Sequence, residues 1–259
     1  MLKGFHPPYT PKGESSLLEP LPWYFAGRVL SLAYDVNADV AQSYLPDGFG
    51  KATGKVYGHV CDWQATTNGW ELLDPAYSQY REYLVLIESM HPDTSEVRLF
   101  CPLIWVDQDI SLVRGLVAGW PKKMASVWVT RTYGVDHIAA APLKEGTRIG
   151  ATVAVKDRRL AEVAATLDGG EGRPFGFLAH QSVCLQGSPT LVGTPDRGVQ
   201  RLLRPAIEQK VVGRLHSGSA QIRYFDSPHD ELLPLAPRGP VEACLCDMGF
   251  TVTGAYAVE

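Results

Sequence analysis

Short runs of alternating apolar and polar residues dominate this chain of 259 residues. They are rich in β-branched, aromatic and leucine residues, and glycine, proline, asparagine and aspartate separate them, which is typical of strands joined by turns. We expect strands over residues 28–36, 55–66, 82–90, 96–106, 126–135, 148–157, 161–168 and 219–226. So many strands predict that most of the core is built from sheet.

Three segments show helical spacing instead. Residues 37–48 begin with a potential N-cap, Asn37, and stop at a proline and a glycine, residues 109–118 begin with an aspartate, and residues 195–211 are the third candidate. No repeat, low-complexity tract or linker divides the chain. We therefore expect a single α+β, mostly β domain over 1–259, with a curved antiparallel sheet that closes into a barrel or cone and few short helices.

Composition and charge exclude several classes of partner. The net charge of −4 and the pI of about 6.0 leave no basic footprint for nucleic acid. No window holds enough uncharged apolar residues for a membrane-spanning helix, and the N-terminus lacks the apolar stretch of a signal peptide. We expect no nucleic-acid or membrane partner.

Cysteine and histidine usage points to a reducing compartment and away from metal sites. The five cysteines are odd in number and scattered through apolar sequence, so we expect a cytoplasmic protein. Cys244 and Cys246 would share one face of a strand, where thiols behave as small buried hydrophobes. The seven histidines form no metal-ligand pair on a helix, so we expect neither a metal nor a cofactor.

The stretch "LVAGWPKKMASVWV" places two lysines, Lys122 and Lys123, among apolar residues. An ordinary lysine has a pKa of about 10.4 and is almost wholly protonated at neutral pH. Lowering that pKa to about 6 would make most of the amine neutral and nucleophilic, at a cost of about 6 kcal/mol. Loss of water and a neighbouring positive charge both act in this direction, and the pair offers both. The alternative interpretation is a turn that carries two solvated lysines.

The wider context resembles the acetoacetate decarboxylase superfamily. In that superfamily an acidic turn, a short helix and a "G-[FYW]-P-K-K-[LM]" segment follow a strand, and this chain has "IWVDQDISLVRG" followed by "GWPKKMA". The segments "YFAGRVLSLAYDVNADVAQSYLPDGF", "VCDWQAT" and "QYREYLVLIE" extend the resemblance over about residues 22–135. The N-terminal half is also similar to the aldolase-dehydratase branch.

The resemblance implies roles for five residues. Lys122 becomes the amine that attacks a substrate carbonyl, and Lys123 either tunes that amine or holds the turn through an ion pair. Acetoacetate decarboxylase is itself a standard example of such lysine activation, so this mechanism comes from the family. Arg28, Asp62 and Glu82 match the arginine and the acidic pair around the lysine, although each has a simpler interpretation as a surface charge. Glu82 is the best supported, because a carboxylate beside an apolar strand needs a cation.

An iminium at Lys122 is an electron sink that supports more than one outcome. The aldolase-dehydratase branch has a glutamine where this chain has Ala118 and a tyrosine where it has Phe250, so with Trp120 the substrate pocket becomes more apolar. We therefore expect a lyase that decarboxylates a 3-oxo acid. Aldolase or dehydratase chemistry on 2-oxo acids through the same lysine is the alternative, and a non-catalytic barrel that binds an apolar acid is the third hypothesis.

The expected partners are a small-molecule oxo acid and further copies of the same chain. Members of the family are usually homo-oligomers, and the aromatic, proline-rich segments "FHPPYTP" and "LPWYF" are suited to cover a neighbouring subunit. We expect at least a dimer.

Overall fold

The computed structural model describes residues 1–194 and 196–258, and one sheet carries every strand in this part of the chain. The strands are β1 (Trp23–Asp35), β2 (Lys51–Thr66), β3 (Gln79–Met90), β4 (Val97–Val106), β5 (Lys122–Met124), β6 (Ser126–Val129), β7 (Arg148–Val155), β8 (Arg158–Glu171), β9 (Ser182–Gln186), β10 (Arg201–Val212), β11 (His216–Tyr224) and β12 (Val241–Val258). The helices are α1 (Ala38–Gln42) and α2 (Asp109–Ala118), with short 3-10 turns η1 (Trp70–Leu72), η2 (Ile138–Ala140), η3 (Gly176–Leu178) and η4 (Leu233–Leu235).

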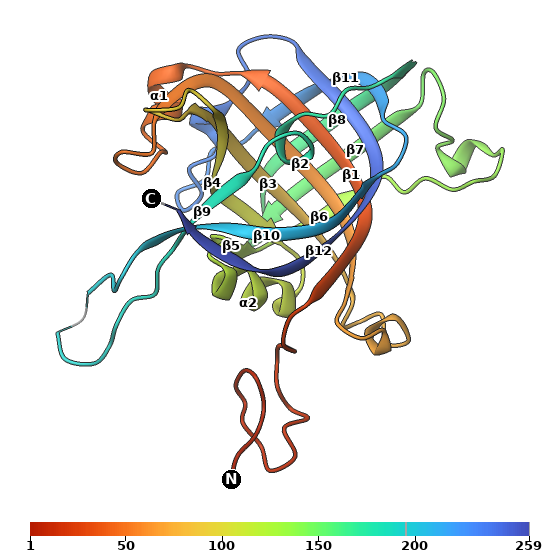
Figure 1. Cartoon of the computed structure of the whole chain (residues 1–259). Helices are drawn as coiled ribbons and strands as arrows, with labels where there is room; N and C mark the ends of the chain where they lie inside the picture. Colours follow the sequence, from red (N-terminus) through yellow and green to blue (C-terminus); the bar gives the residue numbers. More distant parts are fainter. Residues whose placement is uncertain (195, 259) are drawn as a thin grey trace.

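The sheet closes because β1 pairs with both β2 and β12. The order β1-β2-β3-β4-β9-β10-β12 therefore forms a barrel, and β11, β8, β7 and β6 continue from β12 as an extension. Figure 1 shows α2 beneath β5 at one end of the barrel, with the N-terminal segment reaching away from the same end. The barrel interior near α2 is thus the place where strand ends and a helix meet.

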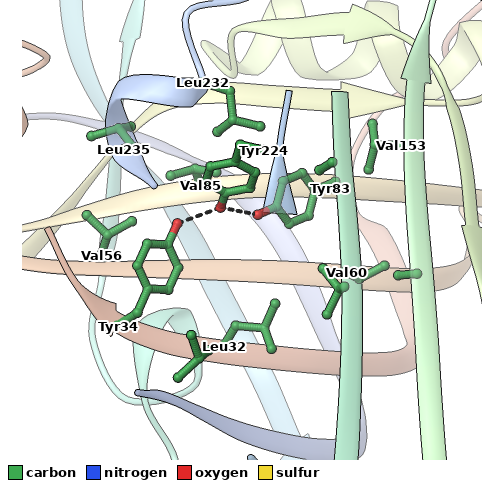
Figure 2. Close-up of a cluster of buried hydrophobic side chains, with 14 of the residues drawn as sticks. Leu32, Tyr34, Val56, Val60, Tyr83, Val85, Val153, Tyr224, Leu232 and Leu235 are labelled. Carbon is green, nitrogen blue, oxygen red and sulfur yellow. Dashed lines mark hydrogen bonds between the residues drawn. The ribbon is translucent and has the colours of Figure 1, made fainter. Parts of the chain in front are cut away.

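Two apolar cores lie on opposite faces of the barrel wall. The inner core contains Val29 and Cys61, whereas the next residues along β1 and β2, Leu30 and Val60, belong to an outer core beneath the extension. Alternation along each strand produces this division. The outer core holds three tyrosines in a chain, as Figure 2 shows: the hydroxyls of Tyr34 and Tyr83 each lie 2.6 Å from that of Tyr224.

The expected mostly β barrel with few short helices is confirmed, and α2 occupies the predicted residues 109–118. The helix expected over 37–48 forms only over Ala38–Gln42. The helix expected over 195–211 is wrong: residues 201–212 form strand β10, and residue 195 lies outside the described residues. Pro205 cannot donate a helical hydrogen bond. The segment instead forms a strand because it pairs over most of its length with β12, with two irregularities in register.

Burial agrees with the interpretation of Cys244 and Cys246 as small buried hydrophobes, and all five cysteines are free and buried. The thiols of Cys244 and Cys246 lie in the inner core, on one face of β12. Within the described ranges, no helix combines the length and the apolar character that a membrane span requires.

Candidate active site

Lys122 is placed by a strand-helix-strand connection at one end of the barrel. Strand β4 leads into α2, which ends at Gly119 in the left-handed region, and β5 then pairs in parallel with β4, Lys122 opposite Ile104. Gly119 is one of the positions where glycine is needed, because its φ of 92° costs other residues energy. The tight return to the edge of β4 directs the Lys122 side chain into the barrel, where it is 8% exposed.

The amine of Lys122 sits among three polar side chains. Its Nζ donates to Glu82 Oε2 at 3.1 Å and to Ser111 Oγ at 2.9 Å. The other oxygen of the 9% exposed Glu82 side chain accepts from Trp63 Nε1 at 2.8 Å. Lys122 Nζ also lies 5.2 Å from the ring centroid of Tyr80. The positive charge of Lys122 and the negative charge of Glu82 compensate each other, so the pair can be buried in the folded protein. Glu82 is also a proton acceptor in contact with the amine.

The stem of Lys122 lies directly against Gly115 of α2. A Cβ at that position would approach Lys122 Cδ to 2.3 Å and Cε to 2.6 Å. Carbon atoms in contact are ordinarily about 3.5–4.0 Å apart, so only glycine leaves the lysine its observed path. The helix therefore sets the position of the amine.

Lys123 points to the other side, as alternation along an extended strand requires. Its amine lies 2.5 Å from Asp230 Oδ1 and donates to the His229 carbonyl at 2.7 Å. Burial alone would raise the pKa of Asp230, but hydrogen bonds from Lys123, Trp105 and Ser227 outweigh it and hold that pKa below its ordinary value. These contacts favour a role for Lys123 in holding the turn, and they give its charge a partner away from Lys122.

Arg114 enters the site from α2 and was not anticipated from the sequence. It lines the same cavity as Lys122, its Nε is buried without a hydrogen-bond partner, and its guanidinium carbon lies 5.5 Å from the ring centroids of Trp23 and Phe25. Burial lowers the pKa of Arg114, although an arginine remains charged at neutral pH. In the described residues no carboxylate lies within ion-pair distance of it.

A signal for Arg114 was present in the helix. Ser111, Arg114, Gly115 and Ala118 follow spacings of three and four residues, so they share one face of α2. Ser111 contacts the Lys122 amine, and the other three line the cavity. Reading the helix for the face that meets the lysine would have found the arginine.

The cavity around these groups has a volume of about 490 Å³ and a mostly apolar wall. Ala118, Trp120 and Phe250, the residues expected in the substrate pocket, line this cavity together with Lys122. Burial raises the pKa of the Tyr80 hydroxyl well above its usual value, so Tyr80 stays protonated. Volumes of about 300–1,000 Å³ are typical of pockets for ligands much larger than a simple oxo acid.

Arg28 and Asp62 do not join this site, contrary to the expectation that they surround Lys122. They lie opposite each other on β1 and β2 and face the outer side of the wall, where both line a separate pocket. Arg28 makes two hydrogen bonds of 2.7 Å to Asp247, and Asp62 lies 3.7 Å from Arg131. Glu82 pairs with Cys61 of the inner core, one residue away from Asp62, so strand alternation separates it from the two.

In the part of the chain that the structure describes, no three histidine, cysteine, aspartate or glutamate side chains are grouped so as to hold an ion.

The chain matches one protein family and several solved structures. The family model for acetoacetate decarboxylase matches residues 6–259. No curated protein matches the chain. Among solved structures, the enduracididine biosynthesis enzyme MppR complexed with pyruvate is 27% identical, with a TM-score of 0.91 over 100% of this chain and 98% of that one. MppR has also been solved with the condensation product of pyruvate and imidazole 4-carboxaldehyde, with 28% identity, a TM-score of 0.91, and coverage of 99% and 97%.

Two more distant structures share the fold. An acetoacetate decarboxylase-like enzyme from Sphingomonas wittichii RW1 is 23% identical, with a TM-score of 0.87 over 99% of this chain and 100% of that one. The acetoacetate decarboxylase of Legionella pneumophila is 15% identical, with a TM-score of 0.72 and coverage of 93% and 88%.

Proposed function

Because the chain belongs to the acetoacetate decarboxylase family, we propose that it is a lyase whose Lys122 amine forms a Schiff base with an oxo acid. The observation that carries this proposal is that one cavity holds two cations: Lys122, which is paired with Glu82, and the half-buried Arg114, which has no carboxylate within ion-pair distance among the described residues. A cation that is partly removed from water and has no ion-pair partner is stabilised when a ligand supplies the anion. Arg114 therefore takes the carboxylate, and Lys122 takes the carbonyl.

Glu82 supplies the proton transfers. Transfer of a proton from Nζ to Oε2 over the observed 3.1 Å contact leaves a neutral amine, which attacks the carbonyl carbon. Loss of water from the adduct gives the iminium. The hydrogen bond from Trp63 keeps the second carboxylate oxygen fixed during these steps.

The unpaired Arg114 favours reactions in which the carboxylate is retained. Loss of CO₂ moves negative charge out of the carboxylate, so a cation bound there stabilises the ground state more than the transition state. A 2-oxo acid held in this way can instead lose a proton from C3 to Glu82, and the resulting enamine can attack an aldehyde carbon. The new alkoxide then takes a proton from Glu82 or from the protonated Tyr80, and water releases the product from Lys122.

We therefore propose an aldolase-type reaction of a 2-oxo acid first, and this reverses the order that the sequence suggested. The pyruvate-bound relative supports this order, because it is more similar to the chain than the decarboxylase is. Positions 118 and 250 lack the glutamine and the tyrosine of the aldolase-dehydratase branch. In the proposed reaction Glu82 and Tyr80, which lie near the Lys122 amine, transfer the protons instead.

Decarboxylation of a 3-oxo acid is the second candidate, and the apolar wall around Trp120 and Phe250 favours it. An apolar surrounding weakens the solvation of a carboxylate, which CO₂ loss relieves. A 3-oxo acid would satisfy this mechanism only if its carboxylate lay against that wall and away from Arg114.

Borohydride trapping with product analysis tests the proposal. Pyruvate and acetoacetate are incubated separately with the protein, the imine is reduced, and the modified peptide is located by mass spectrometry. We expect a pyruvate adduct on Lys122, and with added benzaldehyde we expect a carbon–carbon bond-forming product and no CO₂. Absence of an adduct with either acid would leave only the non-catalytic binder, and CO₂ release from acetoacetate at a comparable rate would put decarboxylation first.

A further inference from the structure

The cavity has a second polar region, away from Lys122 along the barrel wall. Ser182 at the start of β9 and Lys210 of β10 line it there, and the Lys210 amine bonds to η3. Ser182 pairs with Leu99 of β4, whereas Lys122 pairs with Ile104 of the same strand. At about 3.3 Å per residue, these points on β4 are about 16 Å apart. The second region is therefore distinct from the Schiff-base group.

Ser182 has an unused hydrogen-bonding group in this region. The residue is 6% exposed, and its hydroxyl has no partner among the described residues. Buried hydroxyls in native structures are nearly always paired, so an exception that faces a cavity calls for a ligand. A ligand acceptor at this place would satisfy it.

Lys210 contributes a cation that makes two hydrogen bonds within the protein. Its amine donates to the carbonyls of Phe177 at 3.1 Å and Leu178 at 2.7 Å, which occupy two of the three N–H groups of an ammonium. In the described part of the chain, no carboxylate lies within ion-pair distance of this amine. The third N–H is therefore available to an anion in the cavity.

The charges along the cavity are unbalanced. Glu82 is the one acidic residue among the described lining residues, and it is already paired with Lys122. In the described residues neither Arg114 nor Lys210 has a carboxylate within ion-pair distance, and Arg204 adds further positive charge to the lining. Apolar side chains, among them Phe25 and Phe250, line the wall as well.

We propose that Ser182 and Lys210 form an anion-binding subsite for a carboxylate at the distal end of the ligand. The carbonyl partner of the reaction then carries an acidic group separated from its reactive carbon by an apolar body. This inference rests on the proposed function for the carboxylate at Arg114, and the distal subsite itself stands on the contacts of Ser182 and Lys210.

Equilibrium binding of unreactive acids tests the subsite without any covalent step. Adipate, suberate and sebacate are titrated against hexanoate, octanoate and decanoate at low ionic strength, with the fluorescence of the cavity tryptophans as the signal. A charge-assisted contact at Lys210 should make the best diacid bind about tenfold more tightly than the monoacid of the same length. Equal affinity of each diacid and its monoacid would overturn the proposal.

Three variants and a control assign the effect to the subsite. Lys210→Gln should remove the preference for diacids, Lys210→Arg should keep it, and Ser182→Ala should reduce it about threefold without lowering the melting temperature, because the hydroxyl lacks a protein partner. The control Lys144→Gln removes an exposed lysine paired with Asp136 and should change nothing. A preference that survives in Lys210→Gln as fully as in this control would sink the proposal.

Pyruvate trapping in the same variants separates the two proposals. Lys210→Gln should still trap pyruvate at Lys122, because the Lys210 amine bonds to the carbonyls of Phe177 and Leu178 and not to the partners of the Lys122 amine. If the native protein traps no oxo acid but prefers diacids through Lys210, the Schiff-base function fails and the subsite stands. If it traps pyruvate but shows no preference for diacids, the subsite fails alone.

Discussion

Replacing Gly115 by alanine should displace the Lys122 amine without unfolding the protein. The new Cβ would lie 2.3 Å from Lys122 Cδ, 2.6 Å from Cε and 2.7 Å from Cγ. Ordinary carbon contacts are about 3.5 Å or longer, so the stem must move by about 1 Å. The helix backbone cannot retreat freely, because α2 is tied to β5 and β9 through Gly119 and through Gln186, which donates to the Val117 carbonyl at 2.7 Å.

A displacement of this size is large for the chemistry and small for the fold. Misplacement of a reacting group by about 1 Å can cost about 100-fold in rate. Alanine gains about 1 kcal/mol of helix propensity over glycine, whereas overpacking costs about 1–3 kcal/mol. We therefore expect the rate of borohydride-dependent trapping to fall about 100-fold, while the free energy of unfolding changes by less than about 2 kcal/mol.

The assay compares trapping rates and urea unfolding for Gly115→Ala and a matched control. Gly134→Ala is suitable, because a Cβ at that loop position would meet nothing within 4 Å. Trapping of pyruvate by Gly115→Ala within threefold of the native rate, in a protein shown to be folded, would refute the view that α2 positions the amine.

Lys122→Arg should abolish trapping and turnover, because a guanidinium stays protonated and cannot attack a carbonyl; residual trapping measured by mass spectrometry would contradict this. Arg114→Gln should raise the pyruvate concentration needed for half-maximal trapping about tenfold or more while leaving the amine competent, as a saturation curve would show. Lys123→Ala should lower the melting temperature and leave the acidic limb of the trapping rate unmoved, since its amine faces Asp230; a limb displaced to higher pH would restore the tuning role. Asp230→Asn should cost about 2 kcal/mol of unfolding free energy at neutral pH. Because the folded pKa of Asp230 is depressed, that difference is fully present above its ordinary value of 3.8 and is lost as the pH falls below it, which urea titrations at neutral and acid pH would measure. Sedimentation should give a mass of at least two chains, and a single-chain mass would contradict the expected assembly.

The local sequence pattern was enough to predict those elements whose residues fit only one kind of secondary structure. Helix α2 has an aspartate at its first position and a glycine immediately after its last, so its bounds follow from sequence. The opposite directions of Lys122 and Lys123 follow from adjacency in an extended segment, whatever surrounds it. Strand β10 was missed because "LLRPAIEQKV" also fits a helix, and its pairing partner β12 lies about 50 residues away in sequence.

The face of each strand that meets the ligand could not be predicted in the same way. Residues Val29 to Tyr34 are all buried, because the inner core covers one face of β1 and the extension covers the other. When both faces are apolar, alternation does not mark the inside. The family resemblance placed Arg28 and Asp62 with Glu82, alternation gave no means to test this, and the structure puts them on the outer wall.

The sequence by itself determined the chemistry that is present: a pair of lysines after a helix, an acid on an apolar strand, and an extensive sheet. Tertiary structure decided which of these groups meet, because closure of β1 on β12 fixes one inner face for seven strands at once. That closure brings Glu82 to Lys122 from 40 positions away and turns one face of α2, with Arg114, toward the same cavity. Contacts between distant segments depend on register and closure, and no local pattern encodes either.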